Sequence, residues 1–356
     1  MASQSDPILD AIRKTREALE LRPNTHWVLA FSGGKDSTAA LMILLAAYRS
    51  LARKKIDITI IYCDTGVENI ILDRYVKYTL GSLRSEFRAA DIPVNIKILS
   101  APPCDRFFVR IVGRGYPPPT NSFRWCTKNL RIIPVSDYLS ACNDRQTVVI
   151  LGLRKNESQQ RDRTIPTSGD PYWQKQKEST RAIDCFLPII HLNLQEVWDT
   201  IFLLQNPKAI SVKELEELYR GASGECPVIK APQSPPCASG RFGCWTCTVV
   251  RKDKSARELI RSGHQELEPF LQFRDWIAEF RNDPDNRWAN RRNGNVGLGP
   301  FSIRARKEIL RKIESLEEST GTTILNGEER ELIDYLWTLD HVPRLDFRKL
   351  RSRLYQ

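Results

Sequence analysis

Residues 32–38 have the types and spacing needed to hold phosphate groups. They read SGGKDST and lie between the apolar run 27–30 and a helical pattern that begins near residue 39. The adjacent glycines let the backbone turn tightly and bring its amide groups close to an anion, the hydroxyls add donors, and the lysine adds a positive charge. We predict nucleotide binding by Ser32, Gly33, Gly34, Ser37 and Thr38, with catalytic roles for Lys35 and Asp36.

The spacing of this loop excludes two common nucleotide motifs. It lacks the GxxxxGK[ST] spacing of the Walker loop, and it lacks the third glycine of GxGxxG. An ordinary Gly-Gly turn is the remaining alternative, and the position between a predicted strand and a predicted helix argues against it.

Two more polar groups directly follow predicted strands. Asp64 and Glu68 come after the β-rich run 56–62, where they could hold Mg2+ or contact a nucleoside; helix-capping acids are the alternative. Arg154, Glu157 and Arg161 follow the run 147–153, where cations could clamp an alpha phosphate or an anionic substrate. A solvated charged turn is the alternative for this second group.

Four cysteines within 22 residues predict a metal centre. They are spaced C-x10-C-x6-C-x2-C among glycines and prolines, and four thiolates suit tetrahedral zinc or a 4Fe-4S cluster. Only the last two form a close pair, which is not the double CxxC of a zinc ribbon and favours iron-sulfur. The predicted ligands are Cys226, Cys237, Cys244 and Cys247.

Cys126 stands apart from these four, between Arg124 and Lys128. Neighbouring cations are expected to lower the pKa of a thiol and to favour the nucleophilic thiolate. The residue could carry a persulfide, replace one of the four cluster ligands, or be structural.

The pattern of the chain predicts an α/β protein. Strands at 56–62, 94–99 and 147–153 alternate with helices at 39–52 and 72–90, which is typical of a doubly wound parallel sheet with ligands at the carboxyl ends of its strands. Regular alternation ends after about residue 190, and a helix over 251–280 and another over 301–319 are expected further on. We predict an ATP-binding domain over 1–205 and a cysteine-rich, mainly helical appendage over 206–356.

The composition indicates which class of protein and which kind of partner to expect. The 356 residues are 41% hydrophobic and 27% charged, with a net charge of +11, so an anionic partner such as nucleic acid fits. No apolar run reaches the length of a membrane span and no secretory signal is visible, so we expect a cytoplasmic protein with no membrane partner. Nine cysteines in a reducing compartment are expected to be thiols or metal ligands.

One basic stretch has the composition of a DNA contact. Residues 281–292 combine four arginines with Trp288 and Asn290, which would suit phosphate contacts and base stacking. A solvated loop is the alternative.

Together these segments resemble the phosphoadenosine-phosphosulfate reductase branch of the PP-loop ATP pyrophosphatases. The resemblance rests on SGGKDS at 32–37, DTGVE at 64–68 and the GLRKNES segment from 152 with a later arginine at 161. Within that branch the chain resembles the DndC and SspD type of DNA phosphorothioation sulfurtransferases. That closer likeness rests on FRWCT at 123–127, YRGASGECP at 219–227 and RFGCWTCTVV at 241–250.

The resemblance implies a PP-loop fold of the adenine nucleotide alpha hydrolase type that uses ATP with Mg2+ and carries a 4Fe-4S cluster. It also implies an ATP pyrophosphatase that acts as a DNA sulfurtransferase in DNA modification and restriction, with DNA, a cysteine desulfurase as sulfur donor and other phosphorothioation proteins as partners. A phosphoadenylyl-sulfate reductase, a tRNA thiolase and a cluster-containing nucleic-acid-binding scaffold without turnover are the alternatives.

Overall fold

The computed structural model describes residues 6–52, 56–142, 146–155, 170–178, 181–223 and 242–339. The chain forms two compact units that interleave along the sequence. Unit 1 takes Met1–Cys63, Ile71–Leu99 and Val135–Phe242, and unit 2 takes Asp64–Ile70, Ser100–Pro134 and Gly243–Gln356. The sequence predicts one domain boundary, after residue 205, and this boundary stays a prediction.

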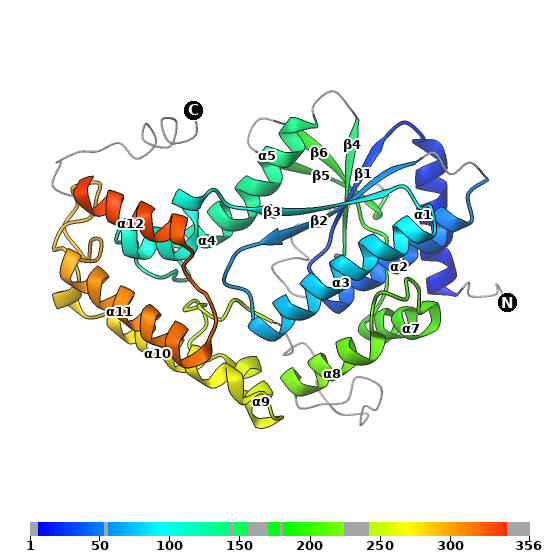
Figure 1. Ribbon diagram of the computed structural model, residues 1–356. Helices are drawn as coiled ribbons and strands as arrows, with labels where there is room; N and C mark the ends of the chain where they lie inside the picture. Colours follow the sequence, from blue (N-terminus) through cyan, green and yellow to red (C-terminus); the bar gives the residue numbers. More distant parts are fainter. Residues whose placement is uncertain are drawn as a thin grey trace. The chain divides into compact units, whose positions relative to one another are not determined.

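Unit 1 is built on a mixed sheet (Figure 1). Its six described strands are ordered β3-β2-β1-β4-β6-β5. The pairs β1–β2, β1–β4 and β4–β6 are parallel, and β5–β6 is antiparallel. The strands are β1 (His26–Ala30), β2 (Asp57–Asp64), β3 (Val94–Ser100), β4 (Thr147–Leu151), β5 (Trp173–Glu178) and β6 (Arg181–Phe186).

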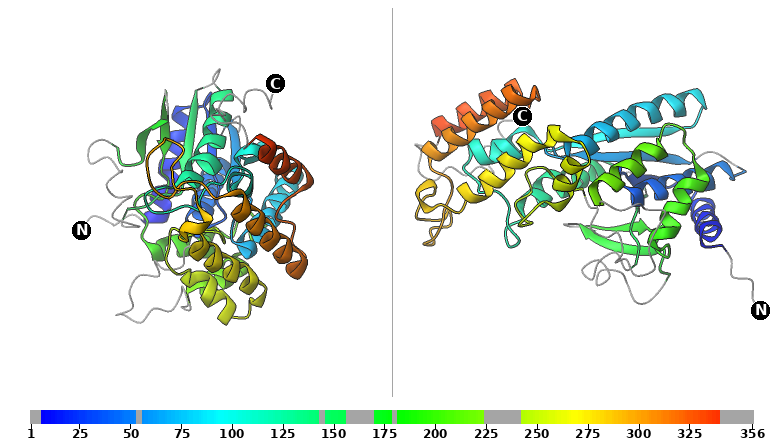
Figure 2. Two further views of the ribbon diagram at one scale, coloured as in Figure 1. Left: turned by 90° about the vertical axis from the view of Figure 1, so that its left-hand side faces the viewer. Right: turned by 90° about the horizontal axis from the view of Figure 1, so that it is seen from below.

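Helices cover both faces of this sheet, as Figure 1 and the two further views of Figure 2 show. The described helices of the unit are α1 (Pro7–Leu21), α2 (Lys35–Arg49), α3 (Ile70–Ala89), α5 (Ile133–Ala141), α7 (Leu194–Leu204) and α8 (Val212–Ser223). Successive residues of β1 face opposite ways: Trp27 and Leu29 pack into one core, and Val28 packs into another with Leu139 of α5. The predicted doubly wound α/β class is therefore confirmed.

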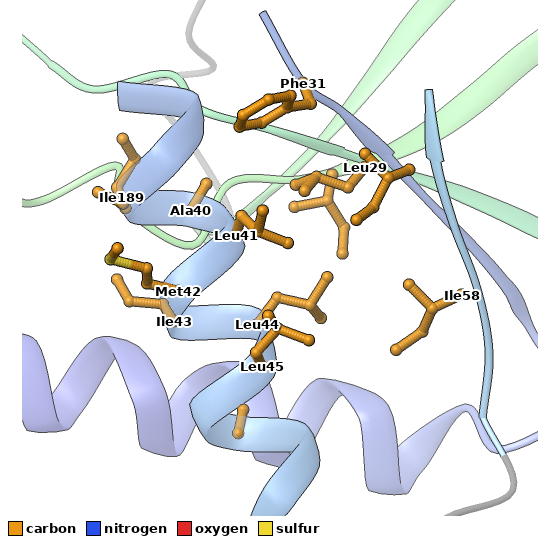
Figure 3. Close-up of a cluster of buried hydrophobic side chains, with 14 of the residues drawn as sticks. Leu29, Phe31, Ala40, Leu41, Met42, Ile43, Leu44, Leu45, Ile58 and Ile189 are labelled. Atoms are coloured by element: carbon orange, nitrogen blue, oxygen red, sulfur yellow. The ribbon is translucent and has the colours of Figure 1, made fainter. Parts of the chain in front are cut away.

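Helix α2 lies at the centre of the larger core. Leu41 and Leu44 point from α2 toward Leu29 of β1 and Ile58 of β2 (Figure 3), and all four side chains are at most 1% exposed. Because almost every residue of α2 is buried, the helix and the loop that precedes it are held firmly against the sheet.

Unit 2 is mainly helical. Its described helices are the short α4 (Trp125–Thr127), α9 (Lys254–Arg261), α10 (Glu268–Phe280), α11 (Ile303–Thr320) and α12 (Gly327–Leu339), with π-helical turns at Val109–Gly113 and Lys128–Ile132. Phe108, Trp245 and Phe273 pack together in its core, with Phe301 and Ile309 in the same cluster. The predicted helical C-terminal region is thus confirmed. No helix in the described ranges is long and apolar enough to cross a membrane.

One expectation about the elements was wrong, and one helix was missed. The helix expected over 251–280 is two helices, because α9 ends at Arg261 and Gly263 has a φ of +117°. The last described strand, β6, does end before residue 190, but helix α7, which begins at Leu194 with Asn193 and Glu196 forming a capping box, was not predicted. Here the local capping signal was present in the sequence and was overlooked.

Candidate functional site

The predicted phosphate loop lies where such a loop can bind a ligand. It joins the end of β1 to the start of α2, and the neighbours of β1 are β2 on one side and β4 on the other. The chain order of the strands reverses there, and crevices at such switch points are the usual ligand sites of open α/β sheets. Gly33 has a φ of +73°, and a Cβ atom on it would lie 2.0 Å from Cγ2 of Val76. Only glycine fits this turn.

Hydroxyl groups brace the loop from inside. Oγ of Ser37 donates to the carbonyl oxygen of Gly34 at 2.9 Å and lies 3.1 Å from Oγ of Ser32. The backbone amide of Ser32 donates to Oγ of Ser37 at 3.2 Å. Among the residues that the structure describes, the buried Oγ1 of Thr38 has no hydrogen-bond partner, and an unsatisfied buried hydroxyl is costly.

An acid between two cations completes the start of α2. Oδ2 of Asp36 accepts from Nζ of Lys35 at 2.8 Å, and Oδ1 accepts from Nε of Arg154 at 2.8 Å. Burial raises the pKa of Asp36, but Lys35 and Arg154 outweigh it and hold the pKa below its ordinary value. The carboxylate therefore stays charged and fixes both cations beside the loop. The structure thus brings Arg154 to Asp36, and its role toward a phosphate stays a prediction.

Two residues at this loop were not predicted. The backbone amide of Lys35 donates to the hydroxyl of Tyr219 at 3.2 Å, and Nζ of Lys35 lies 5.2 Å from the centre of the Tyr219 ring. Gly152 is also required, because a Cβ atom there would lie 2.7 Å from the carbonyl oxygen of Asp36. Tyr219 lies 184 positions from Lys35 in the chain, and no local pattern linked the two.

Other predicted residues are only partly tested. Glu157 and Arg161 lie outside the described residues. Oδ1 of Asp64, the last residue of β2, accepts from the amide of Gly66 at 2.8 Å. Glu68 belongs to unit 2, where its carboxylate pairs with Nη2 of Arg131 at 3.0 Å. A role of Asp64 and Glu68 toward Mg2+ stays a prediction.

Three of the predicted functional cysteines, Cys126, Cys244 and Cys247, belong to unit 2. Burial raises the pKa of the Cys244 thiol, and the thiols of Cys247 and Cys126 add to that rise. The sulfur of Cys244 lies 3.9 Å from Oε2 of Glu68 and 3.9 Å from Nη2 of Arg131. The other predicted ligands, Cys226 and Cys237, lie outside the described residues. Among the residues that the structure does describe, no group of three His, Cys, Asp or Glu side chains is close enough to hold a metal ion.

The expected lowering of the Cys126 pKa was wrong. Burial raises the pKa of this thiol, and Arg131 counteracts the burial only in part. The guanidinium of Arg124, which we expected to act on the thiol, instead donates to Oδ1 of Asn121 at 3.2 Å. Burial and the charge of Glu68 likewise raise the pKa of Cys244. Burial therefore works against the thiolate form of both residues.

A buried arginine holds the segment that carries the last two cysteines. The guanidinium of Arg274 on α10, only 2% exposed, donates to the carbonyl oxygens of Cys247 at 2.9 Å and Arg251 at 3.2 Å, and also to that of Val250. It also pairs with Asp275. This role was not predicted, although an arginine beside the apolar residues Phe273 and Ile277 of one helix is a readable signal.

Known proteins show similarity to most of the chain. Among curated proteins, the uncharacterized protein MJ0066 of Methanocaldococcus jannaschii is 26% identical over 178 residues, which are 50% of this chain and 31% of the relative. The uncharacterized protein MJ0973 of the same organism is 27% identical over 187 residues, 52% of this chain and 38% of the relative. The chain thus spans about a third of the length of these curated relatives.

Solved structures show a weaker likeness. Candida glabrata FMN adenylyltransferase in complex with FAD and inorganic pyrophosphate has a TM-score of 0.39 and 16% identity, covering 89% of this chain and 84% of that one. The phosphoadenylyl-sulfate reductase of Candida auris has a TM-score of 0.36 and 14% identity, covering 61% and 93%.

The family comparison covers both the loop and the cysteine segment. The model of the phosphoadenosine phosphosulfate reductase domain matches residues 26–250. That range includes the phosphate loop after β1, Arg154, Cys126, and both Cys244 and Cys247. With more than half of its length matched, the chain belongs to the phosphoadenosine phosphosulfate reductase domain family, which is a family of enzymes.

Proposed function

We propose that the protein is an ATP pyrophosphatase and sulfurtransferase that activates a backbone phosphate of DNA and replaces one of its oxygens with sulfur. The loop after β1 is the observation that carries this proposal. Its glycine turn, its hydroxyls and the buried Oγ1 of Thr38 are suited to bind a phosphate chain at the start of α2.

In the first step, a non-bridging oxygen of the DNA phosphate attacks the alpha phosphorus of ATP. The bond from that phosphorus to the bridging oxygen breaks, and pyrophosphate leaves. The loop amides and Lys35 would stabilise the charge that develops on the leaving group, with Arg154 held in place by Asp36. Mg2+ would be held by carboxylates, and Asp64 and Glu68 stay our candidates.

In the second step, a sulfur nucleophile attacks the activated DNA phosphorus. A phosphorus–sulfur bond forms, the bond to AMP breaks, and neither displacement changes an oxidation state. If the sulfur arrives as a persulfide, a second thiol must then attack the inner sulfur and form a disulfide, which releases the phosphorothioate. Cys126, Cys244 and Cys247 are thiols of one unit that could take these roles.

The same thiols are candidates for the 4Fe-4S cluster that the resemblance implies. Thiolate is the ligand that such clusters take from proteins, and Cys126, Cys244 and Cys247 belong to one unit. Because the described residues do not complete a metal site alone, we propose that Cys237 or Cys226 supplies the remaining ligation. When bound, the cluster would supply sulfur or electrons. A cysteine desulfurase as donor and other phosphorothioation proteins as partners belong to the same proposal.

Release of pyrophosphate from ATP tests the first step. We expect Lys35→Ala and Asp36→Asn to lower the rate by about 100-fold or more, because each disturbs charge at the leaving group. Lys213→Ala is the matched control, since Lys213 lies in the same unit and its side chain is 84% exposed. Release at the normal rate by both loop variants, purified without oxygen, would remove the assignment.

A phosphoadenylyl-sulfate reductase is the second candidate, because it fits the family equally well. It predicts release of sulfite from phosphoadenylyl sulfate with a thiol reductant and no cleavage of ATP. A tRNA thiolase would be distinguished from the sulfurtransferase by its substrate, and a binding scaffold would show no turnover. Mass spectrometry of digested DNA from cells with and without the gene, searched for phosphorothioate dinucleotides, decides for or against the sulfurtransferase.

A further inference from the structure

Unit 2 contains a pocket that the proposed chemistry does not use. Its volume is about 690 Å³, within the range of about 300–1,000 Å³ that is usual for small-molecule sites. The walls come from two segments of the same unit, residues 115–123 and 281–300. The side chains that matter for its chemistry are Tyr116, Phe123, Arg281, Arg287, Arg291 and Arg292.

Two arginines of the pocket, Arg281 and Arg287, are held by neutral groups of the same unit. Nη1 of Arg281 donates to the carbonyl oxygen of Pro119 at 2.8 Å and to Oγ1 of Thr248 at 3.0 Å. Nη1 of Arg287 donates to the carbonyl oxygen of Arg281 at 2.9 Å. Within the stretches that the structure describes, neither guanidinium forms an ion pair with a carboxylate. These arginines are therefore oriented by neutral acceptors and keep their full charge for a ligand.

The electrostatics of the pocket agree with a need for an anion. Burial lowers the pKa of Arg287 to about 10, with a further contribution from Arg281. Burial also lowers the pKa of Arg281 and of Arg292. The acid Asp283 lies in the same segment but is used to cap the turn that follows it, accepting from the amide of Asp285 at 3.0 Å. An anionic group in the pocket would offset the burial of these charges and the repulsion between Arg281 and Arg287.

The opposite wall is aromatic. The rings of Tyr116 and Phe123 are inclined by only 14°, with centroids 6.3 Å apart. The guanidinium of Arg110 lies 4.9 Å from the centre of the Tyr116 ring, whereas Phe123 is 43% exposed. A flat group that enters the pocket can therefore stack on Phe123.

The two walls are joined by hydrogen bonds to backbone carbonyl oxygens, so the pocket exists before any ligand arrives. The amide of Phe301 donates to the carbonyl oxygen of Gly115 at 2.8 Å. Gly115 has a φ of +70°, and a Cβ atom there would lie 2.8 Å from the backbone oxygen of Phe301. The fully buried Arg306 donates to the carbonyl oxygen of Gly113 at 2.9 Å.

We infer that this pocket binds a nucleotide of a single-stranded nucleic-acid segment, with its phosphates on the arginines and its base stacked on Phe123. The shared chemistry is a phosphate attached to a flat ring, which a free mononucleotide also offers. Several separate arginines suit successive singly charged phosphates of a strand, and a base is free to stack on a side chain only when it is unpaired. The inference deepens the proposed function, since an enzyme that modifies a nucleic-acid phosphate must hold the strand.

Fluorescence anisotropy of a labelled ten-residue oligothymidylate tests this inference on the full chain without ATP. We expect Arg291→Ala to weaken binding and to reduce the slope of log K against log salt by about 0.7, the value for one phosphate contact on a single strand. Phe123→Ala should weaken binding at least about fivefold, the lower end for loss of one stacked base. Arg311→Ala on α11 is the matched control, because it removes the same charge from an exposed site that does not line the pocket.

Three other outcomes would contradict the inference, and a fourth would contradict only the proposed function. Binding that Arg291→Ala and Phe123→Ala leave unchanged, in variants that melt like the parent, places the strand elsewhere. Displacement of the oligonucleotide by AMP or inorganic phosphate at comparable concentration makes this a site for a free nucleotide or phosphate. An equal affinity for the same sequence as a duplex would exclude a stacked base, because only an unpaired base can stack on Phe123. Strand binding that follows the prediction in a protein that releases no pyrophosphate from ATP would retain the pocket and remove the proposed function.

Discussion

The phosphate loop of unit 1 and the arginine pocket of unit 2 are both suited to phosphate, but they are assembled in opposite ways. The loop takes its glycines, hydroxyls and lysine from residues 32–38, between one strand and one helix. The pocket joins two segments more than 150 positions apart, and its arginines are oriented by backbone carbonyl oxygens. A site that lies within one connection between two elements can be recognised from its amino-acid sequence. A site that depends on packing between distant segments cannot.

The largest effect is expected where packing alone positions a functional segment. Arg274→Met leaves three carbonyl oxygens of residues 247–251 without their buried donor. Each bond to a charged group is worth about 1.5–3 kcal/mol, so we expect unit 2 to lose about 3 kcal/mol or more of its free energy of unfolding. Urea unfolding measures the loss. The iron content of anaerobically prepared protein should fall with it if this segment supplies cluster ligands.

The control for Arg274→Met is Arg261→Met. Arg261 pairs with Glu258 on the surface of α9, and its side chain is 73% exposed. Such exposed pairs contribute at most about 1 kcal/mol. If the two variants lose equal stability, Arg274 does not hold the cysteine segment in the way that its hydrogen bonds indicate.

The next effect concerns the contact between β4 and the phosphate loop. Gly152→Ala places a Cβ atom 2.7 Å from the carbonyl oxygen of Asp36 and 2.8 Å from the amide nitrogen of Ser37, so the backbone must shift. We expect a loss of about 1–3 kcal/mol in stability and about 100-fold in ATP-dependent pyrophosphate release. Gly81→Ala on α3 is the control, since nothing lies within 4 Å of its added Cβ atom. That change should leave activity intact and stabilise the helix by about 0.5–1 kcal/mol.

The same difference, between local features and features that depend on packing, decides how much of the fold and of the site could be predicted from the sequence. The parallel sheet, the order of the first strands and helices, and the loop at 32–38 were visible because strand and helix periodicities alternate there. Tyr219 at the loop was missed because its partner is 184 positions away. The sequence suggested a lowered pKa for Cys126 from its neighbours Arg124 and Lys128, but burial decides the direction, and burial depends on the whole of unit 2.

A smaller effect is expected at Tyr219, which contacts the phosphate loop from a distant part of the sequence. Its hydroxyl oxygen accepts a hydrogen bond from the backbone amide of Lys35. A bound phosphate oxygen would need the same amide as its donor. Tyr219→Phe keeps the ring against Trp198 and Phe242 but frees that amide. We expect ATP to bind up to about fivefold more tightly, as one net hydrogen bond of about 1 kcal/mol allows. Tyr78→Phe, at a residue 71% exposed, is the control. Weaker binding in Tyr219→Phe would mean that the hydroxyl contacts ATP directly.

The smallest effect separates the two units by the direction of their response to pH. The pKa of Asp36 is lowered in the folded protein, so its contribution to stability is present above the ordinary aspartate pKa and is lost as the pH falls through the lowered value. The pKa values of Cys126 and Cys244 are raised, so their contribution is present below the ordinary thiol pKa and is lost as the pH rises toward the raised values. We expect Asp36→Asn to flatten the acid side of the stability profile of the metal-free protein, and Cys126→Ser with Cys244→Ser to flatten only the alkaline side. Urea unfolding across pH measures both slopes. An acid slope that Asp36→Asn does not change would mean that Lys35 and Arg154 do not hold this carboxylate charged, and the comparison between the two units would then lose its electrostatic basis.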